Sequence, residues 1–146
     1  MKIVHTLIAG LFGGLTNSIG IWLCGFLGIT TALGFNFTPE LTMKWLLPRL
    51  VPSALWGLLF LLPFWEKTIF RKGIVLSLLP AVFMLFMVFP KMGAGMLGLM
   101  WGNTAPLFAL FFTVIWGLTA ASWLKLFKQD KNADLVRVGV SQVSLK

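Results

Sequence analysis

The sequence is poor in the side chains that carry out most protein chemistry. Its 146 residues include no tyrosine, one cysteine and one histidine. A single cysteine cannot close a disulfide within the chain. His5 and Cys24 are too few ligands for a metal site within one chain or for haem held by two histidines. We therefore expect no catalytic residue, no metal and no cofactor, and the sequence leans against an enzyme without excluding one.

Acidic residues are equally scarce. The four of them are Glu40, Glu66, Asp130 and Asp134, and all fall outside the long apolar stretches. A proton-coupled exporter of the small multidrug type needs a carboxylate inside the membrane, where a proton and a cationic substrate compete for it. The glycines between positions 93 and 102 also lack the Lys-Ser/Thr ending of a phosphate-binding loop. Neither mechanism is supported.

Hydrophobic residues are abundant instead. They make up 58% of the chain, against 11% charged residues, and the mean hydropathy is +0.93. A helix needs roughly 20 apolar residues to cross a bilayer, and four such stretches occur, at residues 3–27, 44–65, 73–90 and 105–127. This pattern predicts an all-α membrane protein with four transmembrane helices arranged as two hairpins. Residues 1–128 would form a single transmembrane domain, and 129–146 a polar tail that we expect to be disordered or to form a short strand on a partner.

The basic residues predict the orientation of these helices. With four crossings, three of the 12 basic residues fall on one side, namely Lys44, Arg49 and Lys91. The remaining nine fall on the other side, namely Lys2, Lys67, Arg71, Lys72, Lys125, Lys128, Lys131, Arg137 and Lys146. Basic loops are retained in the cytoplasm, so both termini are expected there. The compact chain favours a bacterial inner membrane, and anionic lipid headgroups account for the net charge of +8 without any nucleic acid.

The two connections on the opposite side are unusually apolar. They span residues 28–38 and 92–104 and are candidates for re-entrant segments. The uncharged stretch from Met92 to Phe127 is too long for one crossing of about 20 residues. A break is expected around residues 102–106, where Asn103 or Thr104 can cap a helix and Pro106 suits its first turn.

The first apolar stretch has two different faces. At 100° per residue, Gly10, Gly13, Gly14 and Asn17 share one side of a helix. Bulky residues, including Phe12, Ile19 and Phe26, cover the other side. Small residues let helix backbones approach closely in a membrane, so the glycine side is expected to touch protein and the bulky side lipid. Asn17 would then be either a packing residue that bonds a neighbouring helix or a polar station on a solute path.

A second set of residues suggests a binding site near the outer ends of the helices. Arg49 is expected to lie about one turn inside the membrane, with Lys44 at the interface. Together with Asn103 and Thr104 they could hold an anion, a lipid headgroup or a quinone carbonyl. Ordinary anchoring to lipid phosphate is the alternative. Pro48, Pro52, Pro63 and Pro80 are expected to bend or end helices and to open gaps between them.

Three functions are compatible with these features. The first is a non-catalytic accessory or scaffold subunit that associates, through its glycine-rich helix face, with itself or with another membrane protein. The second is a small oligomeric channel or transporter for an uncharged or anionic solute. The third is a membrane enzyme that acts on a lipid or quinone. The expected partners are the bilayer, a protein partner or second copy, and a lipid or quinone ligand.

Overall fold

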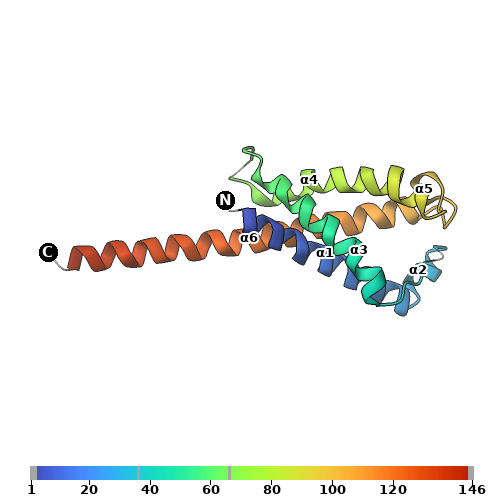
Figure 1. Ribbon diagram of the computed structural model, residues 1–146, viewed down its shortest axis with the longest axis horizontal. Coiled ribbons are helices and arrows are strands. Elements are labelled where there is room, and N and C mark those ends of the chain that lie inside the picture. The colour runs from blue at the N-terminus through green and yellow to red at the C-terminus, as the bar shows by residue number, and fades with distance from the viewer. Residues whose placement is uncertain (1–2, 36, 66, 145–146) are drawn as a thin grey trace.

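The fold is known from a computed structural model that describes residues 3–35, 37–65 and 67–144. Lys2, Glu66 and Lys146, which entered the sequence analysis, lie outside the described residues. Within them the chain is 81% helical and has no strands. The elements in order are α1 (Ile3–Phe26), α2 (Ile29–Ala32), α3 (Met43–Gly57), the 3-10 helix η1 (Leu58–Leu61), α4 (Ile69–Phe83), the π-helical η2 (Met84–Val88), α5 (Phe89–Lys91), the 3-10 helix η3 (Met96–Gly98) and α6 (Ala105–Ser144) (Figure 1).

Three helices are long and apolar enough to cross a membrane. They are Ile3–Phe26, Ile69–Lys91 and Ala105–Ser144, and each overlaps one of the stretches expected from the sequence. The expected stretch at 44–65 corresponds to α3 and η1, which end earlier, at Leu61. Leu62 is extended, with ψ at 133°, because the residue before a proline, here Pro63, is pushed out of the helical region.

The C-terminal segment differs from its prediction. Disorder was expected after residue 128, with a short strand on a partner as the alternative, whereas α6 continues to Ser144. The side chains from Lys125 to Ser144 are all exposed, so packing does not hold this part of the helix. Extending an existing helix avoids the unfavourable nucleation step, and the segment contains no proline to end it.

The helices pack where glycines let two backbones meet. The packed pairs are α1 with α3, α1 with α6, and α4 with α6. A Cβ added at Gly57 would lie 2.2 Å from the Thr6 carbonyl oxygen, and one at Gly117 would lie 2.3 Å from that of Gly73. Gly13 lies against Trp116, whose indole Nε1 donates to the Gly10 carbonyl oxygen at 3.2 Å. The contacts α1–α3, α1–α6 and α4–α6 are therefore direct backbone contacts.

One face of α1 packs against the rest of the protein, and the opposite face is exposed. Gly10, Gly13 and Gly14 are buried against α3 and α6 of the same chain. Phe12, Ile19 and Phe26 are exposed, at 41%, 43% and 73%. The glycine side of α1 is thus already occupied inside the subunit.

Lys72 joins α3 and α4 at the end of the molecule that also holds the start of α1. This end is called the N-terminal end below. The Lys72 side chain is only 3% exposed. Its ammonium donates to the carbonyl oxygen of Phe60 at 2.8 Å and to that of Leu62, two carbonyls that are free because η1 ends there. Carbonyl oxygens at the end of η1 therefore contribute to stabilising the buried charge.

The apolar connections pack on each other at the opposite end, called the far end below. Thr104 Oγ1 donates to the Leu33 carbonyl oxygen at 2.8 Å. Gly102 lies so close to Gly34 that an added Cβ would be 2.3 Å from its carbonyl oxygen. The rings that join the two connections to the helices belong to Phe35, Phe37, Phe89, Trp101 and Phe108. The break expected before the last helix is confirmed, because α6 begins at Ala105.

The close contact between α1 and α3 predicts that Gly10 tolerates no side chain. A Cβ at Gly10 would lie 2.3 Å from the Ser53 carbonyl oxygen and 2.9 Å from the Gly57 Cα. Gly10→Ala should lower the free energy of unfolding by roughly 1–3 kcal/mol, the usual range for overpacking. The midpoint of thermal unfolding, followed by circular dichroism in mild detergent, checks this.

Gly139 provides the matched control, since it lies in α6 with nothing within 4 Å of an added Cβ. Gly139→Ala should leave the midpoint unchanged or raise it, because alanine favours a helix by about 1 kcal/mol over glycine. Equal midpoints for the two variants would contradict the packing described here.

Candidate functional site

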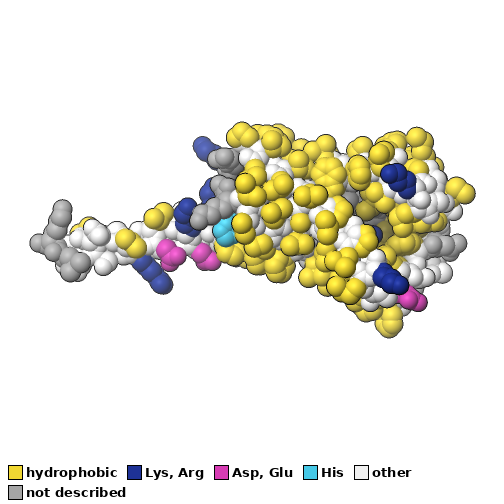
Figure 2. Space-filling model, viewed as in Figure 1, with side chains coloured by type: hydrophobic (Ala, Val, Ile, Leu, Met, Phe, Trp, Pro, Cys, Tyr) yellow, Lys and Arg dark blue, Asp and Glu magenta, His cyan; other side chains and the backbone are white. Residues whose placement is uncertain are grey.

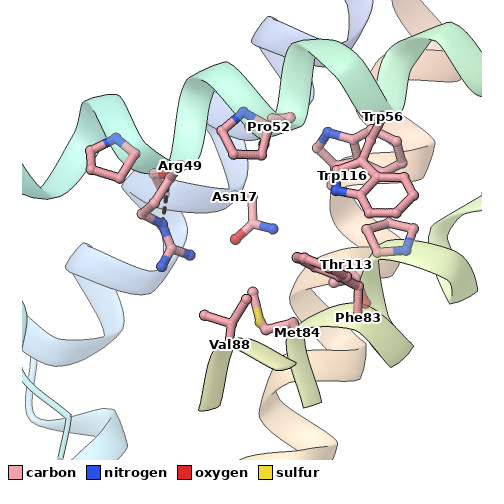
Figure 3. Close-up of a pocket in the computed structure, with 14 residues that line it drawn as sticks. Asn17, Arg49, Pro52, Trp56, Phe83, Met84, Val88, Thr113 and Trp116 are labelled. Atoms are coloured by element: carbon pink, nitrogen blue, oxygen red, sulfur yellow. Dashed lines mark hydrogen bonds between the residues drawn. The ribbon is translucent and has the colours of Figure 1, made fainter. Parts of the chain in front are cut away.

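A cavity of about 140 Å³ lies among α1, α3, the α4–η2 segment and α6 (Figure 3). We call it the Arg49 cavity. Its walls are mostly apolar, and the residues that form them include Pro48, Pro52, Trp56, Pro80, Phe83, Met84 and Val88. The polar residues that line it are Asn17, Ser18, Arg49, Ser53, Thr113 and Trp116.

Prolines explain why this space stays open. Pro48 and Pro52 lie within α3, and Pro80 lies within α4. A proline inside a helix removes a backbone donor and pushes away the preceding turn. The helix that contains Pro80 widens into the π-helical η2 shortly afterwards, and such widenings are frequent at functional sites. The prolines were predicted to open gaps between helices, whereas the π segment carries no sequence signal beyond Pro80.

Arg49 is the only basic residue among the described residues that line this cavity. It lies about 9 Å along α3 from Met43 at 1.5 Å per residue. Its Nε donates to Ser18 Oγ at 3.2 Å, and its guanidinium carbon lies 4.7 Å from the centre of the Trp45 ring. Within residues 3–35, 37–65 and 67–144, no acidic side chain pairs with it. Its positive charge is therefore not balanced by the described part of the chain.

Asn17 lies beside Arg49 and has no partner of its own. Its side chain is 7% exposed, and its Oδ1 has no hydrogen bond in the described part of the chain. Figure 3 shows the amide pointing into the cavity, between Arg49 on α3 and Thr113 on α6. A buried amide without a partner is unfavourable by about 1–3 kcal/mol, so the site has unused hydrogen-bonding capacity.

The other candidate binding residues lie elsewhere. Lys44 and Asn103 are exposed, and Thr104 is bonded to Leu33 at the far end. None of the three lines the Arg49 cavity. Lys44 and Arg49 are five residues apart, which separates their directions by about 140° on a helix. The structure therefore does not bring the four residues together, and it places Arg49 with Ser18 and Asn17 instead.

The Arg49 cavity closes toward the N-terminal end. A buried cluster occupies the interior there, formed by Ala9, Phe60, Leu76, Trp116, Ala120, Ala121 and Leu124. The cavity is lined by both α3 and α4, which are not among the closely packed pairs of helices. In Figure 2 this face of the molecule is covered by hydrophobic side chains and is hollowed between α3 and the α4–α5 segment. The cavity that contains Arg49 therefore opens at the side of the helix bundle, on an apolar surface.

Comparisons with protein-family models, with curated proteins and with solved structures find no match for the chain.

The unbalanced charge predicts that Arg49 does not stabilise the fold. A charge shielded from water without an acidic partner is unfavourable, and a hydrogen bond between helices in an apolar setting, such as that to Ser18, returns only about 0.6 kcal/mol on average. Arg49→Met should therefore leave the thermal midpoint in lipid nanodiscs unchanged or raise it.

Lys44→Met is the control for charge removal, because Lys44 lies on the same helix but is exposed. It should leave the midpoint unchanged. A clear drop for Arg49→Met alone would show that Arg49 is a structural residue and would remove the reason to treat the cavity as a site.

Proposed function

We propose that this integral membrane protein binds the acidic headgroup of a lipid-like molecule at Arg49 and admits it from the bilayer between α3 and α4. The observation that carries the proposal is Arg49 itself, a cation without an acidic partner in the described chain, beside the unpaired amide of Asn17. Ionisable residues inside a membrane usually mark a functional site.

The chemistry of a guanidinium favours an anionic group as the ligand. Arg49 has five N–H donors in a planar fork, and Ser18 accepts from one of its nitrogens. Carboxylates and phosphates accept two parallel bonds from such a fork and also supply the missing negative charge. The unused hydrogen-bonding capacity of Asn17 would then serve the rest of the headgroup.

The shape of the cavity favours a lipid-like ligand over a solute in transit. Its rings and prolines suit an acyl chain, and the hollow between α3 and α4 opens onto the hydrophobic surface. The buried cluster on the N-terminal side leaves no continuous polar path through the described residues. A binding site therefore explains the geometry better than a channel or transporter does.

The packing of α1 weakens the accessory or scaffold hypothesis. It relied on the glycine side of α1, and Gly10, Gly13 and Gly14 pack within the subunit. A membrane-protein partner or a second copy would have to use the bulky outer faces. A quinone remains the other ligand class that fits Arg49 and Asn17, because its carbonyl oxygens also accept from N–H donors.

We further propose four crossings with both termini in the cytoplasm of a bacterial inner membrane. The fourth crossing would be α3 with η1, whose rises of about 1.5 and 2.0 Å per residue give about 30 Å, the thickness of a bilayer core. Residues 1–128 would form the membrane domain, and 129–146 would extend into the cytoplasm. The nine basic residues on that side support this orientation.

Four crossings predict that Thr31 and Lys67 lie on opposite sides of the membrane, whereas both would share a side if α3 did not cross. Single cysteines at Thr31, Lys67 and Ser141, in a chain where Cys24 is replaced by alanine, would be labelled in intact cells with a membrane-impermeant maleimide. All three positions are exposed. Only the Thr31→Cys variant should react from outside, and outside labelling of both the Thr31→Cys and the Lys67→Cys variants would exclude the fourth crossing.

Acidic-headgroup binding predicts that a brominated fatty acid quenches tryptophan fluorescence, because Trp56 and Trp116 line the cavity. Dibromostearic acid should bind the detergent-purified wild type saturably. Arg49→Gln should weaken this binding about tenfold or more, which corresponds to about 1.4 kcal/mol. A dibrominated phosphatidic acid, measured in the same way, would test phosphate against carboxylate.

The neutral methyl ester of the same fatty acid separates charge recognition from apolar binding. It should bind weakly and equally to wild type and to Arg49→Gln. Tight ester binding that is insensitive to Arg49 would contradict the proposal, and saturable binding of a brominated quinone in place of both acids would favour the quinone alternative.

A further inference from the structure

A second and larger cleft, of about 470 Å³, lies at the N-terminal end, far along the helices from Arg49. It forms where the start of α4 meets α6, just where the side chains of α6 become fully exposed. The residues that line it include Lys67, Thr68, Phe70, Arg71, Lys125 and Lys128. We call it the basic cleft.

The charged side chains among the described residues that line the basic cleft are all of one sign. Four of its described lining residues are basic and none is acidic. Lys125, Lys128, Gln129 and Asn132 follow the spacing that places side chains on one helix face. At 100° per residue, Asp130 and Asp134 point about 160° and 120° away from Lys128. The acidic residues of α6 therefore do not balance the basic residues of the cleft.

The backbone of α4 adds to the positive potential. The cleft includes Thr68, Ile69, Phe70 and Arg71, which are the residues at the start of this helix. The first N–H groups of a helix have no acceptor within it, and the Thr68 side chain makes no capping hydrogen bond. A helix start of this kind attracts anions. Two independent features, side chains and backbone, thus point to the same ligand charge.

The surroundings of the cleft place it at a membrane surface. α4 and α6 both belong to candidate spans, and the cleft lies where the start of α4 meets the part of α6 from which all side chains are exposed. Lys125 Nζ is 5.0 Å from the centre of the Phe70 ring, and Phe70 and Ile74, one turn apart, are exposed at 39% and 41%. An apolar strip therefore leads from the basic cleft along α4, in the direction that an acyl chain would take.

We propose that the basic cleft binds the headgroup of an anionic phospholipid that carries two phosphates. The positive charge of four cationic side chains and an uncapped helix start is larger than the negative charge of one phosphate. The adjacent apolar strip favours a lipid over a soluble diphosphate, because only a lipid has an acyl chain to lie on it. This site is independent of the Arg49 cavity, because the two share no lining residue.

Native mass spectrometry of the delipidated full chain in mild detergent tests this site. Cardiolipin should bind more tightly than phosphatidylglycerol, and phosphatidylcholine should not be retained. The double variant Lys125→Gln/Lys128→Gln should bind cardiolipin about 30-fold more weakly, as expected from the contribution of two basic side chains near a charged lipid.

The double variant Lys131→Gln/Arg137→Gln is the matched control, since it removes the same charge from exposed positions of α6 that do not line the cleft. It should retain wild-type binding, with circular dichroism verifying the helix content of both variants. Equal loss in the two double variants would show attraction by overall charge and would overturn the site. Saturable binding of inorganic pyrophosphate, without any preference for cardiolipin over phosphatidylglycerol, would assign the cleft to a soluble diphosphate and would also overturn it.

Discussion

The close approach of helix backbones at glycines is the constraint on which the rest of this structure depends. Gly57 of α3 and Gly73 of α4 lie almost against α1 and α6, at distances that leave no space for a Cβ. Three packed pairs are fixed in this way, whereas α3 and α4 do not pack closely on each other. Lys72 holds them together at the N-terminal end through the carbonyls of Phe60 and Leu62. The space left between them farther along is the Arg49 cavity.

Two basic residues in this arrangement, the buried Lys72 and the partly buried Arg49, have opposite environments. Lys72 donates to helix-terminal carbonyl oxygens, so its charge is matched by the structure that buries it. Arg49 has one hydroxyl and one ring as partners and faces a cavity. The difference lies in the partners, since the carbonyls at the end of η1 accept from Lys72, whereas no backbone carbonyl in the described part of the chain accepts from Arg49. Buried charge alone would not distinguish a structural lysine from a candidate binding arginine, but the partners of each residue do.

Much of the architecture could be predicted from residue size and helical period. The small and bulky sides of α1 and the start of α6 at Ala105 followed from the spacing of glycine, proline and asparagine. The second apolar stretch was expected to end at Trp65, whereas η1 ends at Leu61. The helix ends earlier because Pro63 pushes the residue before it out of the helical region. The helical tail could not be predicted, because its polar composition suits disorder equally well and only continuity with α6 decides the matter. Of the four candidate binding residues, Arg49 lines the cavity, whereas Lys44, Asn103 and Thr104 do not. Their convergence was expected because the sequence put them on one side of the membrane, and no sequence pattern reports the direction in which each side chain points.

The length of α6 has a mechanical consequence. At 1.5 Å per residue its 40 residues extend for about 60 Å, twice the thickness of a bilayer core. Thr113 and Trp116 form part of the cavity wall, and the same unbroken rod ends at Ser144, about 46 Å from Thr113 at helical rise. Any occupant that tilts the wall by about 5° moves the exposed tip of the rod by about 4 Å. A small change at the cavity wall would in this way become a larger displacement at the exposed tip of α6.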